Sequence, residues 1–347
     1  MSNAAVVTER HRFDEARLAA HLAQHLPGFA GPLEVRQFQG GQSNPTYLLS
    51  TPTRRYVMRS KPGPVAKLLP SAHAIGREYR VMQALGAHGV PVPEMQLLVD
   101  DESVIGRAFF VMAHVDGRIF WDPTLPDLQP AARGAIYDEM NRVLAALHAV
   151  DVQRAGLADY GKAGNYFARQ IGRWSRQYQA SATSVIEAMN RLIEWLPAHV
   201  PAGDETVVVH GDYRIDNLIF HPTEARIIAV LDWELSTLGH PLADLSYHCM
   251  AWHIPPGGFR GMAGLDLAAL GIPSEADYIR RYCERTGGGP IGHWNFYLAY
   301  NLFRIAAILQ GVYKRATEGI ASSDNALQTG NNVKALADLG WQFAQRA

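Results

Sequence analysis

Residues 207–234 of the chain read "VVVHGDYRIDNLIFHPTEARIIAVLDWE". A β-branched run ends at Val209, and two further apolar runs follow, "NLIF" and "RIIAVL". We expect these two runs to pair as a hairpin across "HPTEA", because short apolar segments separated by turn residues are typical of paired strands. This pairing would place Asn217 and Asp232 at the same open end, with Asp212 in the loop after the first strand. Three oxygen-bearing side chains are therefore predicted to converge at one edge.

Converging carboxylate and amide oxygens suit phosphoryl transfer. Magnesium prefers hard oxygen ligands and keeps substrate phosphates in its coordination shell. A carboxylate that does not bind the metal can orient an attacking hydroxyl and accept its proton. The alternative is that these acids are turn residues or helix caps, which is the common role of a single Asp in a loop. The length of the string "HGDxxxxN…LDWE" favours phosphoryl transfer.

Length and composition bound the class of protein. A chain of 347 residues exceeds what one hydrophobic core usually supports, so two lobes are expected. The 32 basic and 33 acidic residues nearly cancel, which argues against a nucleic-acid-binding surface. Two cysteines do not make a disulfide scaffold. The first residues lack the apolar region of a signal peptide, and no apolar stretch reaches membrane-spanning length, so we predict a cytoplasmic location.

The pattern of the chain changes near Asp116 and Gly117. Before this point, residues 28–113 predict a five-stranded antiparallel sheet with one helix, and after it helical periodicity dominates. The predicted fold class is α+β with two lobes. They are a β-rich N-terminal lobe over residues 1–113, a hinge over residues 114–117, and a helical C-terminal lobe over residues 118–347. A ligand site is expected between the lobes.

The string "VVHGDYRIDNLIF…AVLDWELSTLGHPLADLS" resembles the aminoglycoside phosphotransferase and choline kinase-like family, which shares the protein-kinase-like fold. The resemblance implies that Asp212 is the catalytic base and that Asn217 and Asp232 bind magnesium. It also implies structural roles for His210 and for Asp244, which would brace the loop by hydrogen bonds. Asp216 falls outside the matched positions and is interpreted as a turn or cap residue.

The resemblance implies ATP as the phosphate donor, and it predicts where the phosphates are held. The turn in "FQGGQSNPTYLL" would cover them with backbone N–H groups, from Gly40, Gly41, Gln42, Ser43 and Asn44. Arg59 stands at the family's lysine position, and Lys61, two residues on, faces the same side of the strand. Glu78, on the next helix, is predicted to pair with the cation. The alternative is that the two cations form a solvated strand end.

The segment "FFVMAHVDG" resembles the family's hinge. The resemblance implies that Met112 is the gatekeeper residue. It further implies that the carbonyl of Ala113 and the N–H of Val115 contact adenine. The alternative is an ordinary buried edge strand.

The phosphate acceptor is less well specified. Acidic and basic residues are equal in number from Trp233 to the C-terminus, which weighs against a polycationic substrate. The strings "KPGPVAKLLPSAHAIGREYRV", "GNYFARQIGRWSRQY" and "LFRIAAILQGVYKRA" resemble the kinase-like domain found fused to, or beside, acyl-CoA dehydrogenases. That resemblance implies a functional association with these enzymes and a hydroxyl on an acyl chain, such as that of a hydroxyacyl-CoA. Lys67 and Arg304 could contact an anionic substrate group, although an internal salt bridge or a snorkelling side chain is the favoured alternative for Arg304.

Three other functions stay open. The first is a kinase for aminoglycosides, homoserine or amino alcohols. The second is a nucleotide-binding regulator without catalysis, which the replacement of the family's lysine by Arg59 keeps open. The third is a metallohydrolase that uses His210, Asp212, Asp232 and His240, which the absence of a helical His pair disfavours.

Overall fold

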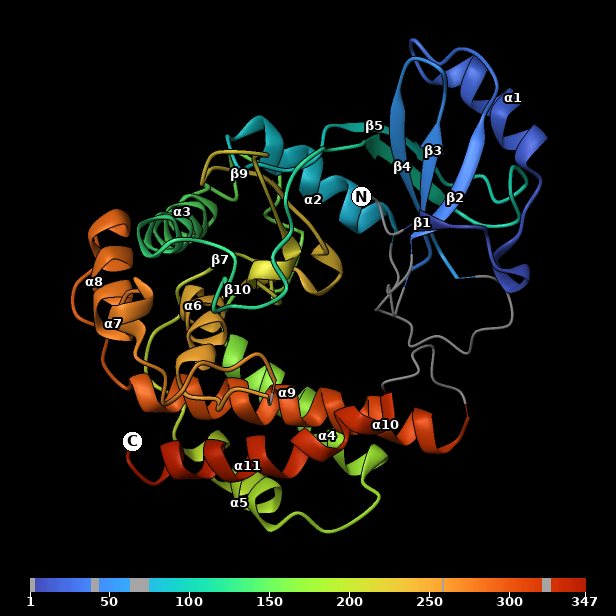
Figure 1. The fold of residues 1–347 in the computed structure, drawn as a ribbon. Helices are drawn as coiled ribbons and strands as arrows, with labels where there is room; N and C mark the ends of the chain where they lie inside the picture. The colour runs from blue at the N-terminus through green and yellow to red at the C-terminus, as the bar shows by residue number, and fades with distance from the viewer. Residues whose placement is uncertain (1–3, 39–43, 63–74, 258, 320–325) are drawn as a thin grey trace.

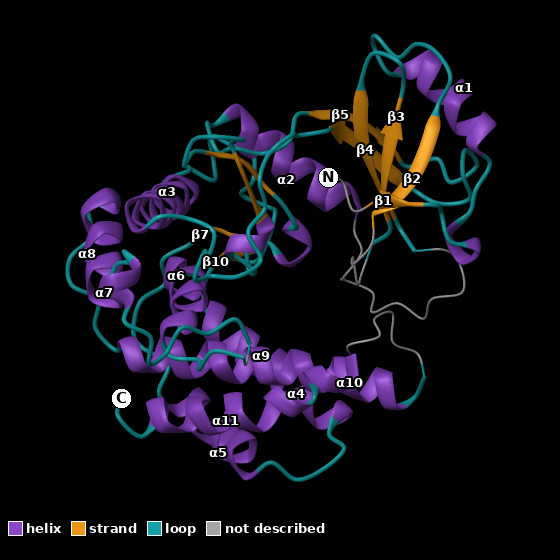
Figure 2. Cartoon of the chain, in the orientation of Figure 1, coloured by secondary structure: helices purple, strands orange, loops and turns teal. Residues whose placement is uncertain are grey.

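The N-terminal lobe is built on a six-stranded antiparallel sheet (Figures 1 and 2). The computed structural model describes residues 4–38, 44–62, 75–257, 259–319 and 326–347. The strands lie in the order β1 (Ala4–Ala5), β2 (Glu34–Phe38), β3 (Thr46–Ser50), β4 (Arg55–Ser60), β6 (Phe109–Ala113) and β5 (Met95–Val99). The predicted five-stranded sheet is therefore confirmed, with the short β1 added at its edge.

The two faces of this sheet bury different clusters, because successive side chains of a strand point to opposite faces. On β6, Phe109 packs with the apolar face of α1 (Glu15–His25), which buries Leu18 and Leu22, and with Leu26 just after the helix. Phe110 packs on the other side with α2 (Ile75–Ala87). Helix α2 also contacts η3 (Trp233–Leu235), a single turn of the second lobe. The helix thus joins the sheet to the segment that carries Asp232.

The second lobe is mainly helical. Its long helix, α9 (Trp294–Thr317), is buried along most of its length and packs against α4 (Tyr166–Ser181), α6 (Pro241–Cys249) and α11 (Asn331–Ala344). Among the described residues, no helix is both long and apolar enough to cross a membrane. The helices of this lobe are α3 (Pro130–His148), α4 (Tyr166–Ser181), α5 (Glu187–Ala198), α6 (Pro241–Cys249), α7 (Leu267–Leu270), α8 (Glu275–Thr286), α9, α10 (Ala326–Thr329) and α11 (Asn331–Ala344).

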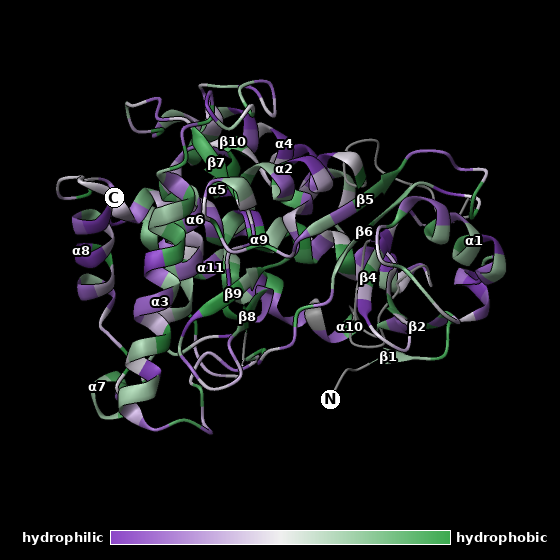
Figure 3. Ribbon diagram, turned by 90° about the horizontal axis from the view of Figure 1, so that it is seen from above, coloured by the Kyte–Doolittle hydropathy of each residue, from purple (hydrophilic) through white to green (hydrophobic). Residues whose placement is uncertain are grey.

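In the described part of the helical lobe, two short strand pairs are present (β7 and β9 are green in Figure 3). Strand β7 (Val207–Val209) pairs with β10 (Thr237–Gly239), and β8 (Leu218–Phe220) pairs with β9 (Ile227–Val230). The second pair is the predicted hairpin. The N–H of Leu231 donates to the carbonyl of Asn217 at 2.8 Å, which closes the pair at one end. Asn217 and Asp232 therefore lie at the same end, as predicted.

The chain between the lobes rests on this hairpin. Arg118 exchanges two backbone hydrogen bonds of 2.8 Å with Phe220 of β8. A Cβ at Gly117 would lie only 2.3 Å from the carbonyl oxygen of Phe220. Glycine at this position therefore allows the connecting segment to lie directly on the strand.

Candidate active site

The loop after β7 is held by a buried carboxylate. Asp244, in the first turn of α6, accepts hydrogen bonds from the backbone N–H groups of His210 at 2.6 Å and Gly211 at 2.8 Å. Gly211 has a φ of +80°, and a Cβ there would lie 2.8 Å from the carbonyl oxygen of Leu235. The tight turn that presents Asp212 therefore depends on a glycine at position 211 and on the hydrogen bonds to Asp244. These hydrogen bonds are the ones that the sequence predicted for Asp244.

Histidines near this loop also have internal partners. Burial opposes the charge of Asp244, but a hydrogen bond from His148 and contacts with His210 and Gly211 hold its pKa below the ordinary value. His210 bonds the carbonyl of Leu231 through Nε2 at 2.8 Å. Its Nδ1 accepts the N–H of Asp212 at 3.1 Å, so the ring braces the loop.

The metallohydrolase interpretation finds no support here. His240 caps α6, with its Nδ1 accepting the N–H of Leu242 at 3.2 Å. Among the residues that the structure describes, no three His, Cys, Asp or Glu side chains are grouped to hold a metal ion.

Both oxygens of the Asp212 carboxylate have partners. Oδ1 accepts the hydroxyl of Tyr247 at 2.5 Å. Oδ2 accepts the side-chain amide of Asn217 at 3.0 Å and lies 3.3 Å from Nε of Arg214. The Asn217 amide also donates to the backbone carbonyl of Asp212 at 2.9 Å. The predicted base and a predicted metal ligand are thus in direct contact.

Asp232 follows β9 in a left-handed conformation, with a φ of 65°. Such a conformation is uncommon outside glycine, and Asp is among the residues that tolerate it. Its Oδ1 accepts Nη2 of Arg59 at 2.9 Å, and the same nitrogen lies 3.0 Å from Oε2 of Glu234. The residue predicted at the family's lysine position therefore crosses between the lobes to reach Asp232.

Arg59 also forms the predicted ion pair with Glu78, from Nε to Oε2 at 3.2 Å. Burial opposes its charge, but Glu78, Asp232 and Glu234 outweigh that effect and raise the pKa of the guanidinium. Burial also opposes the charge of Glu78 and raises the pKa of its carboxyl group. The nearby charge of Arg59 offsets part of this rise. The side-chain amide of Asn44 donates to Glu78 at 3.0 Å. One residue of the predicted phosphate-covering turn is therefore in contact with this cluster.

The structure does not place every predicted phosphate-binding residue in the cluster around Arg59 and Asp232. Lys61 lies 3.2 Å from Glu102 on the surface, whereas Arg59 reaches Asp232. Outside the described residues lie Lys67 and four of the predicted phosphate-loop residues, Gly40, Gly41, Gln42 and Ser43.

The predicted hinge residues continue the sheet. Met112 and Ala113 end β6, where Ala113 lies opposite Tyr56 of β4. The N–H of Ala113 donates to the carbonyl of Glu94 at 2.8 Å. Val115 follows in the connecting segment and is half-buried.

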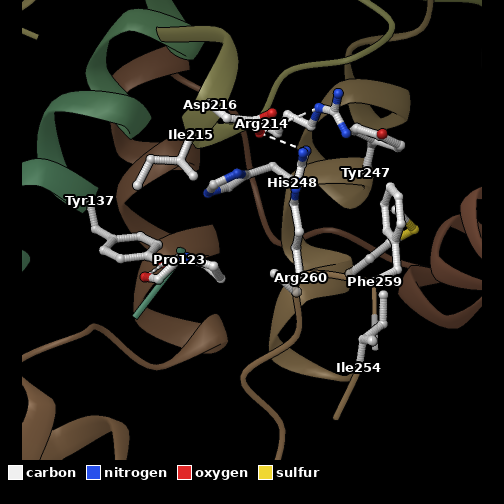
Figure 4. A pocket seen from close by; sticks show the side chains of 12 residues that line it. Pro123, Tyr137, Arg214, Ile215, Asp216, Tyr247, His248, Ile254, Phe259 and Arg260 are labelled. Atoms are coloured by element: carbon white, nitrogen blue, oxygen red, sulfur yellow. Dashed lines mark hydrogen bonds and ion pairs between the residues drawn. The ribbon is translucent and has the colours of Figure 1, made fainter. Parts of the chain in front are cut away.

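A pocket lined in part by Arg214 and Tyr247, which both contact Asp212, combines arginines with apolar side chains (Figure 4). It encloses about 40 Å³. Asp216 pairs there with Arg260 at 2.7 Å and lies 3.5 Å from Arg214. Asp216 lies in a single 3-10 turn, as expected of a turn residue, but it is also buried and ion-paired, which the sequence did not reveal. The apolar part of the lining includes Pro123, Tyr137, Ile215, Ile254 and Phe259.

Arg304, the arginine on the apolar helix α9, has internal partners. Its Nη2 donates to the carbonyl of Gly211 at 2.5 Å. Its guanidinium lies over the rings of Tyr247 at 5.2 Å and Trp174 at 5.6 Å. The internal alternative for this residue is thus the one that the structure shows.

Fold and site together define a kinase-like phosphotransferase. A model of the phosphotransferase enzyme family matches residues 34–283, and the chain belongs to that family. The crystal structure of a "putative aminoglycoside phosphotransferase" from Ralstonia eutropha is 59% identical, with a TM-score of 0.89 over 97% of this chain and 99% of that one. Spectinomycin phosphotransferase, solved with ADP and spectinomycin, is 13% identical and shares the fold, with a TM-score of 0.63 over 95% of this chain and 98% of that one.

Longer relatives carry a different name. Acyl-CoA dehydrogenase family member 10 of Mus musculus is 51% identical over 318 residues, which are 91% of this chain and 30% of the relative. Acyl-CoA dehydrogenase family member 11 of Homo sapiens is 44% identical over 351 residues, which are 99% of this chain and 45% of the relative. The chain therefore spans less than half the length of these curated relatives.

Proposed function

We propose that the chain is an ATP- and magnesium-dependent kinase that transfers the γ-phosphate to a hydroxyl of a small molecule. The observation that carries this proposal is the convergence of Asp212, Asn217 and Asp232 with Arg59 of the other lobe. Asn217 and Asp232 offer an amide oxygen and a carboxylate, which are hard donors that fit magnesium. When bound, magnesium would neutralise charge on the phosphates.

In this proposal each residue has a defined task. Asp212 accepts a hydrogen bond from the acceptor hydroxyl, orients it for in-line attack and takes its proton. Asn217 and Asp232 hold the metal. Arg59, oriented by Glu78, contacts the phosphates, and Lys61 is the second candidate for that contact.

In the same proposal, one lobe binds the nucleotide and the other binds the acceptor. Residues 1–113 hold the nucleotide, with residues 40–44 over the phosphates. Residues 114–117 form the hinge, and Met112, Ala113 and Val115 surround adenine. Residues 118–347 carry the hairpin with Asp212 and bind the acceptor.

We further propose that the acceptor is a hydroxyl on an acyl chain, such as a hydroxyacyl-CoA. Two observations support it: the relatives named as acyl-CoA dehydrogenase family members, and a pocket that joins Arg260 to apolar side chains. The same relatives support a functional association with acyl-CoA dehydrogenases. An aminoglycoside acceptor is the alternative that the name of the Ralstonia eutropha structure favours. Kinases for homoserine or amino alcohols and a non-catalytic regulator are weaker alternatives.

A screen for ATP consumption tests the proposal. Hydroxyacyl-CoAs, aminoglycosides, homoserine and amino alcohols would each be offered with ATP and magnesium, and the phosphorylated product identified by mass spectrometry. We expect turnover with an acyl-chain hydroxyl and a loss of about 100-fold or more in kcat for Asp212→Asn. Asp159→Asn, which changes an exposed carboxylate paired with Arg80, is the matched control. Full activity of Asp212→Asn would remove Asp212 as the base. Magnesium-dependent ATP binding without turnover of any acceptor would favour the regulator.

A further inference from the structure

One turn of α6 supplies two contacts to the loop that carries Asp212. Asp244 holds the loop backbone, and Tyr247, three residues later, donates its hydroxyl to Oδ1 of Asp212 at 2.5 Å. Side chains three residues apart share one face of a helix, so both contacts come from the same surface of α6. The Tyr247 side chain is buried. The first contact sets the path of the chain, and the second acts on the carboxylate itself.

We propose that Tyr247 is a positioning residue that fixes the orientation of the Asp212 carboxylate toward the acceptor hydroxyl. This inference rests on the function proposed above. Asn217 and Arg214 both contact Oδ2, whereas Tyr247 contacts Oδ1. The terminal torsion of an Asp side chain has a broad profile, and rotation about it moves both oxygens together, so donors on both oxygens restrict this rotation more than donors on Oδ2 alone. The Tyr247 hydroxyl supplies the second point of attachment.

The ring of Tyr247 is itself held in place. The Arg304 guanidinium lies 5.2 Å from its centroid, within the range of a cation–π contact. The same guanidinium donates to the carbonyl of Gly211, next to Asp212. Arg304 therefore ties the tyrosine ring to the backbone of the loop. This arrangement sets the hydroxyl and the carboxylate relative to each other before any substrate binds.

The contact is compatible with catalysis by Asp212. A carboxylate oxygen can accept more than one hydrogen bond, so Oδ1 can accept from Tyr247 and from an acceptor hydroxyl at the same time. Burial, followed by the nearby charge of Asp212, raises the pKa of Tyr247 above its ordinary value. The phenol therefore keeps its proton and acts as a donor. The proton of the acceptor goes to Asp212.

Tyr247→Phe tests the proposal, because it keeps the ring and its contact with Arg304 while removing the hydroxyl. With ATP and the acceptor found in the screen, we expect kcat to fall about 10- to 100-fold, as small errors in positioning a reacting group can cost this much. The KM for ATP should change less than about twofold, since Tyr247 contacts the base and not Arg59 or Asp232. A general loss of folding would instead lower the thermal midpoint.

Tyr213→Phe is the matched control. Tyr213 is buried, follows Asp212 directly, and donates its hydroxyl to the carbonyl of Met140 at 2.8 Å. We expect its kcat to stay within about twofold of the wild type. Crystal structures of both variants give a readout that needs no turnover: the Asp212 carboxylate should change orientation in Tyr247→Phe and keep it in Tyr213→Phe.

The outcomes separate this inference from the proposed function. Equal kcat values for the two variants would overturn the role of Tyr247, as would an unchanged Asp212 orientation in Tyr247→Phe. A wild-type protein that phosphorylates no acceptor would instead overturn the proposed function. In that case the two crystal structures still decide whether Tyr247 positions Asp212.

Discussion

Asp212 and Arg59 are both held by charged or polar partners, but the partners of Asp212 all lie in the helical lobe, whereas those of Arg59 come from both lobes. Tyr247, Asn217 and Arg214 surround Asp212. Arg59, on β4, contacts Glu78 on α2, Asp232 just before η3 and Glu234 within η3. The environment of the base is therefore complete within one folding unit, while the cation site depends on how the two lobes meet.

Asp244→Asn should have the largest effect, because it disrupts the hydrogen bonds that hold the loop carrying Asp212. The amide replaces a carboxylate oxygen by an NH2 group, so one of the two backbone N–H groups that Asp244 now accepts would face another donor. We expect the free energy of unfolding to fall by roughly 3 kcal/mol, the scale for breaking a buried charged hydrogen-bond network. Denaturant unfolding measures this change, and kcat should fall with it.

Acid unfolding sharpens this prediction. Because the folded-state pKa of Asp244 is below its ordinary value of 3.8, its ionised form stabilises the fold above about pH 4, and this contribution is lost as the pH falls through the lower folded value. The stability of Asp244→Asn should lack this part of the pH dependence. Asp138→Asn, a half-exposed carboxylate paired with Arg285, is the control and should cost less than about 1 kcal/mol. A similar loss in both variants would contradict the bracing role.

Arg59→Met should affect nucleotide binding more than folding, because it removes the guanidinium that is proposed to contact the phosphates between the lobes. Removing a charged contact to phosphate is expected to cost about 2–3 kcal/mol, which is a 30- to 150-fold rise in the dissociation constant of an ATP analogue. Arg59→Lys should retain part of the affinity, since it keeps the charge but not the planar fork. Isothermal titration calorimetry measures both constants.

Lys61→Met is the control for this comparison, since Lys61 pairs with Glu102 on the surface. We expect it to change the dissociation constant of the analogue less than threefold. If Lys61→Met bound the analogue more weakly than Arg59→Met, the phosphate contact would be assigned to Lys61 instead of Arg59.

The same contrast explains what the sequence could reveal. Asn217 and Asp232 were predicted at one end of a hairpin because the lengths of two strands and one turn determine that placement. The contact of Tyr247 with Asp212 depends on how α6 packs against the loop, and no local pattern encodes that distance. Its spacing of three residues from Asp244 was the available signal.

Contacts across longer separations were harder to predict. Arg260 and Asp216 are 44 residues apart, and their pairing depends on the chain path after α6. Glu234, two residues after the predicted metal ligand, was not predicted as a partner of Arg59 because its side-chain direction depends on the left-handed turn at Asp232. Identity and spacing thus indicated the groups that do chemistry, whereas the groups that orient them came from tertiary packing.

Glu234→Gln should have the smallest effect, and it should be in the opposite direction. Nη2 of Arg59 contacts both Asp232 and Glu234, so phosphates must compete with these carboxylates for the same nitrogen. Neutralising Glu234 removes one competitor and one negative charge, which we expect to tighten binding of an ATP analogue by about three- to fivefold, or roughly 0.5–1 kcal/mol. Glu102→Gln, which neutralises the exposed partner of Lys61, should leave the affinity unchanged. Weaker binding by Glu234→Gln in the same calorimetric titration would show that Glu234 orients Arg59 for the phosphates rather than competing with them.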